Sequence, residues 1–112
     1  MIPKKNRISK DLFEKITKNG KGLSSPFLSV KYLKNDENKS FFATVVSKKV
    51  SKISPKRNLI KRRVNSVVNS NKNHIKQGFF LVFYIKPGAL NQSFDQIKQE
   101  TLDLLKKSGL LL

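Results

Sequence analysis

The sequence predicts an α/β (α+β) two-layer sandwich, in which helices pack on one small mixed sheet. Three observations lead to this class. The chain of 112 residues suits a single domain, which we take to be residues 1–112. Apolar residues recur at helical spacing in some segments and at strand spacing in others. These segments follow in the order helix, strand, strand, helix, strand, helix, which is typical of helices packed on a sheet.

An amphipathic helix is predicted near the start of the chain. Ser9 is a suitable N-cap, and Leu12, Phe13 and Ile16 share one helical face. Asn19 precedes a glycine, and that pair should end the helix.

A loop and two strands should follow. We expect a loop at 21–26, a strand at 27–33 with alternating faces, and a second strand at 41–47. The residues that share one face of the first strand are Leu28, Val30 and Tyr32. Since only a polar turn at 34–40 separates the two strands, they are expected to pair as an antiparallel hairpin.

The second half predicts a long helix and a fully buried strand. Ser54 is placed to cap the helix, with Pro55 at its first helical position, and the helix should reach 69–73. Residues 79–85 are apolar at every position, so both faces of this strand should be buried, as in a central strand. The connection through the helix implies a parallel β-α-β unit, which the general rule predicts to be right-handed.

A last helix should begin at Ser93, with Gln96 as its capping-box partner, and end at Gly109. Its apolar stripe is expected to contain Phe94, Ile97, Leu104 and Leu105.

The charge of the chain points to a polyanionic partner. There are 24 Lys and Arg against 7 Asp and Glu, a net charge of +17, and no carboxylate lies between residues 38 and 94. Within 48–63, eight of sixteen residues are basic, and such a segment repels itself unless an anion lies against it. Part of this charge could reflect the drift of an AT-rich genome toward Lys and Asn. However, three of only four arginines fall in 57–63, which indicates a need for the phosphate-binding guanidinium.

Several classes of protein are excluded by composition. The chain has no Cys and one His, which argues against a disulfide scaffold, a zinc knuckle and a thiol nucleophile. No apolar run approaches the roughly 18–20 residues that span a bilayer, and the N-terminus lacks the apolar core of a secretory signal. We therefore expect a cytoplasmic protein that binds nucleic acid, with no membrane partner, no small-molecule substrate and no protein-bound metal.

The basic helix presents one polar flank. Its apolar residues should face the sheet, and amides and guanidiniums on the flank can hydrogen-bond phosphate, sugar and base edges. The predicted nucleic-acid-binding residues on and before this helix are Lys48, Lys49, Lys52, Lys56, Arg57, Asn58, Lys61, Arg62 and Asn65. Arg63 should point elsewhere, and amphipathicity does not explain an exposed Leu59.

These motifs, taken in order, resemble the bacterial ribonuclease P protein component. Lys48-Lys49-Val50-Ser51-Lys52 followed by Arg57-Asn58-Leu59-Ile60-Lys61-Arg62 is similar to the family's Lys-rich strand end and Arg-Asn helix opening. Arg7-Ile8, the spacing of Phe13, Ile16 and Gly20, Phe27 as a strand start, and Lys86-Pro87-Gly88-Ala89 match further family features. The chain departs from the pattern at Thr17 and Val30, where the family has aromatics, and at Leu59 and Asn65, where it has arginines.

The resemblance implies an α-β-β-β-α-β-α order with a left-handed crossover through the basic helix, contrary to the general rule. It implies a protein subunit that binds the ribonuclease P RNA and the 5′ leader of precursor tRNA. The holoenzyme removes that leader by Mg²⁺-dependent hydrolysis, in which the RNA carries the chemistry. The implied leader cleft, between the basic helix and the sheet, is lined by Phe13, Leu28 and Val30. To these we add Phe27 and Tyr32, which could face either RNA or the core.

The residues themselves show no catalytic constellation. There are no paired carboxylates in the basic region, and His74 is expected to be a solvated or capping residue. The alternatives are a ribosomal or ribosome-assembly protein without processing activity and an autonomous small nuclease, which would need acids near the basic groove to hold Mg²⁺.

Overall fold

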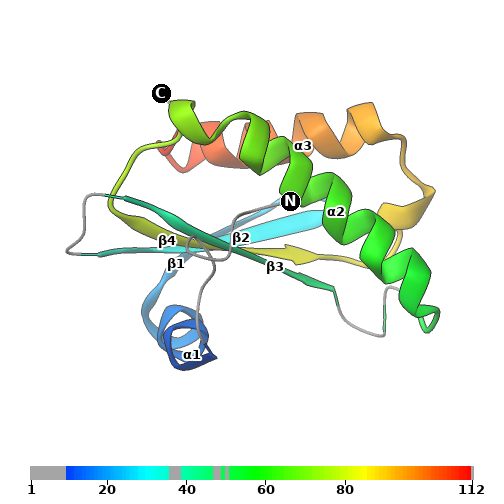
Figure 1. Ribbon diagram of the computed structural model, residues 1–112, viewed down its shortest axis with the longest axis horizontal. Helices are drawn as coiled ribbons and strands as arrows, with labels where there is room; N and C mark the ends of the chain where they lie inside the picture. The colour runs from blue at the N-terminus through cyan, green and yellow to red at the C-terminus, as the bar shows by residue number, and fades with distance from the viewer. Residues whose placement is uncertain (1–9, 36–38, 47–48, 50, 112) are drawn as a thin grey trace.

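The computed structural model describes residues 10–35, 39–46, 49 and 51–111. Figure 1 shows a four-stranded sheet with helices on both faces. In chain order the elements are α1 (Lys10–Asn19), β1 (Lys21–Ser24), β2 (Leu28–Lys34), β3 (Phe41–Val46), α2 (Ser54–Ser70), η2 (Lys72–His74), β4 (Phe79–Ile85), η3 (Ala89–Asn91) and α3 (Phe94–Lys107). The predicted fold class and the α-β-β-β-α-β-α order are confirmed. The predicted cap Ser9 lies outside the described residues.

The strands are ordered β1-β2-β4-β3, so the predicted hairpin between the strands at 27–33 and 41–47 is wrong. β2 pairs antiparallel with β1 and β4, and β3 pairs in parallel with β4. The reason lies in β4, in which every side chain is apolar. A central position, with β2 on one edge and β3 on the other, pairs both backbone edges of such a strand. The helices α2 and α3 then cover one of its faces, and α1 covers part of the other.

The loop expected at 21–26 is largely an edge strand. β1 pairs with β2 in the register Lys21↔Tyr32 to Ser24↔Ser29. Leu23 is its only half-buried residue, and its other side chains are exposed. An edge strand that buries so little lacks the alternation by which a strand is recognised in a sequence. The three strands before the second helix are those that the family resemblance implies.

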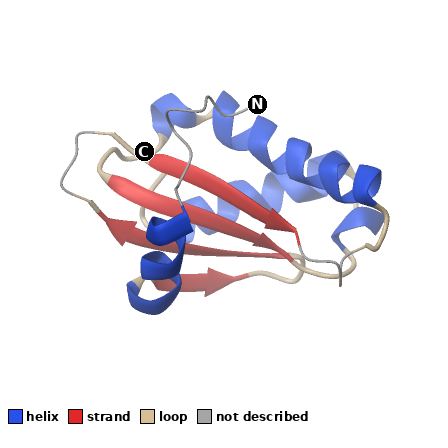
Figure 2. Ribbon diagram, turned by 60° about the horizontal axis from the view of Figure 1, so that its bottom comes forward, coloured by secondary structure: helices blue, strands red, loops and turns tan. Residues whose placement is uncertain are grey.

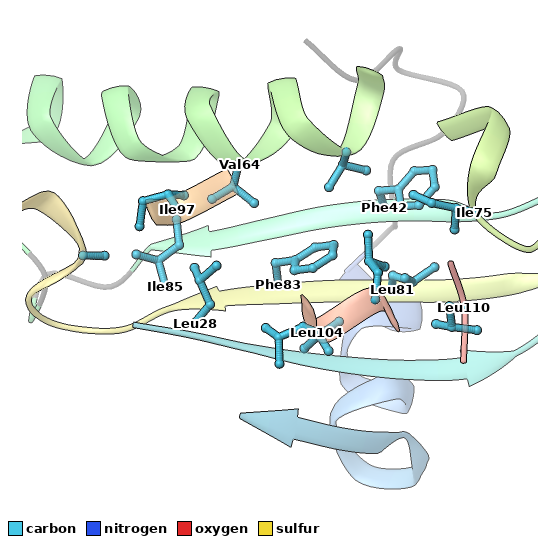
Figure 3. Packing of buried hydrophobic residues seen from close by; sticks show 14 of the residues in the cluster. Leu28, Phe42, Val64, Ile75, Leu81, Phe83, Ile85, Ile97, Leu104 and Leu110 are labelled. Carbon is cyan, nitrogen blue, oxygen red and sulfur yellow. The ribbon is translucent and has the colours of Figure 1, made fainter. Parts of the chain in front are cut away.

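The crossover from β3 through α2 to β4 is left-handed, so the right-handed rule fails here. When the sheet is viewed from the α2 side with both strands pointing up, β4 lies to the left of β3 (Figures 1 and 3). For these strand positions, a right-handed crossover would place α2 on the face that α1 occupies. The left-handed path instead places α2 beside α3, over the larger apolar cluster.

The main core lies between the sheet and the pair α2 and α3 (Figure 3). Phe83, from the centre of β4, is fully buried there, as are Leu28 and Val30 from β2. The buried face of α2 consists of Ile60, Val64, Val67 and Val68, as the helical spacing predicts. Each such side chain contributes about 1.5–3 kcal/mol when fully buried.

A second, smaller core lies on the other face of the sheet, under α1. Ile16 is fully buried against Phe80 and Val82. Figure 2 shows that α1 crosses only one part of this face, and none of the other described helices lies on it. Half-buried residues of β3 and β4 that border this core include Ala43 and Val45 from β3 and Tyr84 from β4.

Two predictions at helix ends are wrong. The N-cap of α2 is Ile53 rather than Ser54, and its side chain makes no capping bond. Phe94, the first residue of α3, is 41% exposed rather than buried in the apolar stripe of that helix. Ser93 does cap α3, since its Oγ accepts from the backbone N–H of Gln96 at 3.1 Å.

The turn between β1 and β2 is held by Glu100, a carboxylate of α3 that is only 6% exposed. Its Oε1 accepts from the Ser25 hydroxyl at 2.6 Å and from the backbone N–H of Phe27 at 3.1 Å. The Nζ of Lys86 donates to the backbone oxygen of Ser25 at 2.8 Å. α3 and the end of β4 are thereby tied to the same turn.

Candidate nucleic-acid interface

The outer surface of α2 carries the predicted basic stripe. Because the four apolar residues of α2 point at the sheet, the polar residues between them face outward. The exposed residues are Lys56, Asn58, Lys61 and Arg62, and the half-buried ones are Arg57 and Asn65. The structure therefore places these six predicted residues on the outer side of one helix, where their side chains are exposed or half-buried.

Arg57 is partly engaged within the protein. Its Nη1 donates to the backbone oxygen of Ser51 at 3.0 Å, and its Nη2 donates to the Ser54 hydroxyl at 2.9 Å. A guanidinium has five N–H donors, so donors remain for an external phosphate. Arg57 thus both holds the segment before α2 and contributes charge to the stripe.

Asn65 is oriented by the sheet below it. The hydroxyl of Thr44, a residue of β3 that is 7% exposed, donates to Asn65 Oδ1 at 2.6 Å. The amide oxygen is thereby turned inward, and the NH₂ group is left as the outward donor. At the position where the resembling family has an arginine, this chain still presents an N–H donor.

The lysines before α2 are only partly described. Lys49 and Lys52 are exposed, whereas Lys48 lies outside the described residues. Two apolar residues interrupt this basic region, since Ile53 is 52% exposed and Leu59 is 38% exposed. Their exposure beside Lys52, Lys56 and the arginines gives the region an apolar component as well as a charged one.

Four of the five residues predicted to line a leader cleft between the basic helix and the sheet have described side chains, and these lie in or against the main core. Leu28 and Val30 are fully buried in the main core, so the prediction that they line a cleft is wrong. Phe27 and Tyr32 are half-buried against the same core, and Tyr32 meets the Phe79 ring edge-on at 6.4 Å between centroids. The side chain of Phe13 is outside what the structure describes. In the described part of the chain, α2 and α3 pack against the sheet over Leu28 and Val30.

Sequence reasoning missed a different partly open surface, on the α1 side of the sheet. The hydroxyls of Thr17 and Tyr84 are 3.1 Å apart, and Lys31 Nζ donates to the backbone oxygen of Thr17 at 3.1 Å. We call Thr17, Lys31, Ala43, Val45 and Tyr84 the α1-side face. The alternation of β4 could have shown this, since Tyr84 shares a face with Phe80 and Val82 rather than with Phe83.

Among the described residues, no three His, Asp or Glu side chains gather as metal ligands. His74 is exposed at the end of η2, as expected for a solvated residue.

The comparison with known families gives one match over almost the whole chain. Residues 2–109 match the family model described as Ribonuclease P. The ribonuclease P protein component of Synechococcus elongatus is 32% identical over 116 residues, covering 98% of this chain and 95% of that protein. The corresponding protein of Alkaliphilus oremlandii is 33% identical over 107 residues, covering 95% of this chain and 93% of its own length.

Solved structures give the same picture. A ribonuclease P protein from Thermotoga maritima superposes with a TM-score of 0.82 at 29% identity, covering 90% of this chain and 96% of that one. A mutant Staphylococcus aureus ribonuclease P protein superposes with a TM-score of 0.89 at 25% identity, covering 96% and 92% of the two chains.

Proposed function

The chain belongs to the ribonuclease P protein family and is a protein subunit of that endoribonuclease, and from this premise we propose which RNA each face of the fold binds. The basic stripe of α2 binds the RNA subunit of the holoenzyme. The α1-side face of the sheet binds the single-stranded 5′ leader of precursor tRNA. The observation that carries the proposal is the stripe on α2, whose polar and cationic groups face outward over a fully apolar inner face.

The stripe suits a folded RNA with closely spaced phosphates. Lys61 and Arg62 are exposed, Asn65 presents its NH₂ group outward because Thr44 holds its oxygen, and no carboxylate lies between residues 38 and 94 to oppose them. Contacts of this kind position a protein on RNA and make its affinity fall with salt.

The α1-side face suits a single strand. Such strands bind where an aromatic ring supports a base and a cation follows the backbone. Tyr84 supplies a half-buried ring there, with Val45 directly beside it in the β3–β4 register, and Lys31 supplies the charge. The face is also the one that α2 and α3 leave uncovered.

The Mg²⁺ that the reaction requires is proposed to be held by RNA. The described residues do not fit a protein-bound Mg²⁺, because no three carboxylate or imidazole groups meet there. Mg²⁺ is commonly bound through phosphates with few protein ligands. The protein then contributes binding and orientation of the two RNAs, while the RNA subunit carries out the hydrolysis.

The cytoplasm is the proposed location. Each helix in the described ranges falls short of the length and apolar character required to cross a membrane. The matched relatives come from bacteria, and precursor tRNA is a cytoplasmic substrate there.

Reconstitution at low Mg²⁺ tests the proposal. The protein is mixed with a bacterial ribonuclease P RNA and with precursor tRNA bearing either a long leader or a one-nucleotide leader. Stimulated cleavage at the mature 5′ end, absent with protein alone, is expected. RNA binding without stimulation, with both a close and a distant catalytic RNA, would instead favour a ribosomal type of binding protein.

Two variants separate the faces. Arg62→Ala should weaken binding of the RNA subunit whatever the leader length. Tyr84→Ala should raise KM only for the long-leader substrate, by about fivefold to tenfold for one lost stacking contact. Tyr84→Phe keeps the ring and removes the hydroxyl that faces Thr17, so it should behave nearly as wild type. An equal effect of Tyr84→Ala on both leaders would place the leader elsewhere.

A further inference from the structure

A groove lies between α2 and α3, on the flank of α2 that faces α3. Its volume is about 220 Å³. This is below the roughly 300 Å³ at which pockets for drug-sized ligands begin, so the groove has room for one planar ring rather than for a cofactor. The lining residues are Ser66, Val67, Ser70, Asn71, Phe94 and Lys98.

Phe94 is the unusual member of this set. Its helical position predicts a core residue, yet it is 41% exposed, and its ring lines the groove. Ile97, three residues later on α3, is fully buried and supplies the packing on the sheet. The Phe94 ring is therefore an open aromatic surface, and the core does not account for it.

Apart from Val67, the other residues that line the groove are polar or cationic. Ser66 and Ser70 are exposed and one helical turn apart, and Lys98 follows Phe94 by one turn of α3. Arg63, which the binding stripe does not use, precedes Ser66 by three residues and Ser70 by seven, so it lies on the same flank of α2. The acidic residue nearest to Phe94 in sequence is Asp95, which points about 100° away from it around α3.

Asn71 gives the groove a defined end. Its Nδ2 donates to the backbone oxygen of Val67 at 2.8 Å, at the end of α2. That hydrogen bond uses only the NH₂ group, so the amide oxygen of Asn71 can accept a hydrogen bond from a ligand in the groove. An aromatic platform, hydroxyl and amide groups, and flanking cations together match the chemistry of an unpaired nucleotide, with its base on the ring and its phosphates beside Lys98 and Arg63.

We propose that this groove binds one unpaired nucleotide of the RNA subunit, with the base stacked on Phe94. The inference rests on the proposed function, and it adds a second RNA contact to the stripe of α2. The RNA subunit is the source because the groove opens on the α2–α3 side of the sheet, continuous with the basic helix. The α1-side face, where the leader is proposed to lie, is on the opposite side of the sheet (Figure 1).

The test measures binding of the purified protein to a ribonuclease P RNA at fixed salt. Phe94→Ala should weaken binding about tenfold, within the range for one lost stacked base, whereas Phe94→Trp should bind at least as tightly as wild type. Phe94→Leu, which keeps apolar volume without a π-face, should resemble Phe94→Ala. Gln99→Ala, an exposed change elsewhere on α3, is the matched control and should have no effect. Circular dichroism melts confirm that every variant folds.

The outcomes distinguish the proposals. If Arg62→Ala weakens binding of the RNA subunit while Phe94→Ala does not, the groove proposal is overturned and the proposed function stands. If wild-type protein does not bind the RNA subunit at all, the proposed function fails. If Phe94→Ala affects only the binding of leader-bearing precursor tRNA, the assigned source of the nucleotide is wrong. Tight binding by Phe94→Leu would show that the ring does not stack a base.

Discussion

Arg57 and Arg62 lie on one helix and carry the same charge, but the structure gives them different roles. Arg62 is exposed, and its guanidinium makes no hydrogen bond to another described residue. Arg57 donates to the Ser51 backbone oxygen at 3.0 Å and to the Ser54 hydroxyl at 2.9 Å. Arg62→Ala should therefore remove a phosphate contact only, whereas Arg57→Ala should also loosen the segment that leads into α2.

The expected magnitudes follow from these contacts. Loss of one phosphate contact flattens the dependence of log K on log salt by about one unit. Between 50 and 200 mM salt, one unit of slope corresponds to about a fourfold change in Kd. The two hydrogen bonds of Arg57 lie near the surface, so we assign them about 1 kcal/mol together, which is about 4 °C in Tm for a domain of this size.

Arg57→Lys separates charge from geometry. Lysine keeps the positive charge but lacks the planar fork that reaches both Ser51 and Ser54. We expect its salt slope to match wild type and its Tm to fall as in Arg57→Ala. The slopes come from equilibrium binding to the RNA subunit at several salt concentrations, and the Tm values come from circular dichroism. A slope for Arg57→Lys as flat as that of Arg57→Ala, or an unchanged slope for Arg62→Ala, would refute the assignment.

Three further changes test the scaffold. Glu100→Ala leaves the backbone N–H of Phe27 without its acceptor, whereas the Ser25 hydroxyl can still donate to the Leu28 oxygen at 3.1 Å. We therefore expect a loss of about 1–3 kcal/mol in unfolding free energy by chemical denaturation; Glu100→Gln, which keeps an acceptor oxygen, should lose less, and equal losses would contradict this account. Gly88→Ala should lower Tm, because Gly88 has φ +93° and a Cβ there would lie 3.1 Å from the Phe27 ring; an unchanged Tm would show that the turn relaxes freely. Thr44→Val should weaken RNA binding severalfold at unchanged salt slope, because Asn65 loses the hydroxyl that orients it; binding equal to wild type would show that Asn65 needs no such support.

Much of the fold could be predicted from local patterns. The bounds of α1, α2 and β4 agree with their predictions to within a few residues, since amphipathic spacing and an all-apolar run are properties of contiguous sequence. The predicted end of the last helix is also confirmed. Gly109 has φ +78°, and the N–H of Leu110 donates to the Leu105 oxygen at 3.0 Å.

The pairing of strands could not be predicted in the same way. The hairpin prediction treated β2 and β3 as neighbours because they are adjacent in sequence, but β4 lies between them. Pairing depends on which strand is best suited to the centre of the sheet. Deciding this requires a comparison of strands that lie more than 30 residues apart in the sequence. The family resemblance supplied the left-handed crossover and the third early strand, which local patterns did not.

The sequence by itself determined the chemistry of this protein and the phase of its basic helix. Charge and the absence of carboxylates are additive properties of the residues, and the inward face of α2 follows from the spacing of its valines and isoleucine. Only the tertiary structure decided which surfaces are open. Leu28 and Val30 became core because α2 and α3 pack over them, while Tyr84 and Phe94 remained partly exposed or exposed. The alternation of β4 gives the face of Tyr84, but only the tertiary structure shows that this face is partly open. Burial depends on what a distant segment places over a residue, whereas charge and helical phase do not.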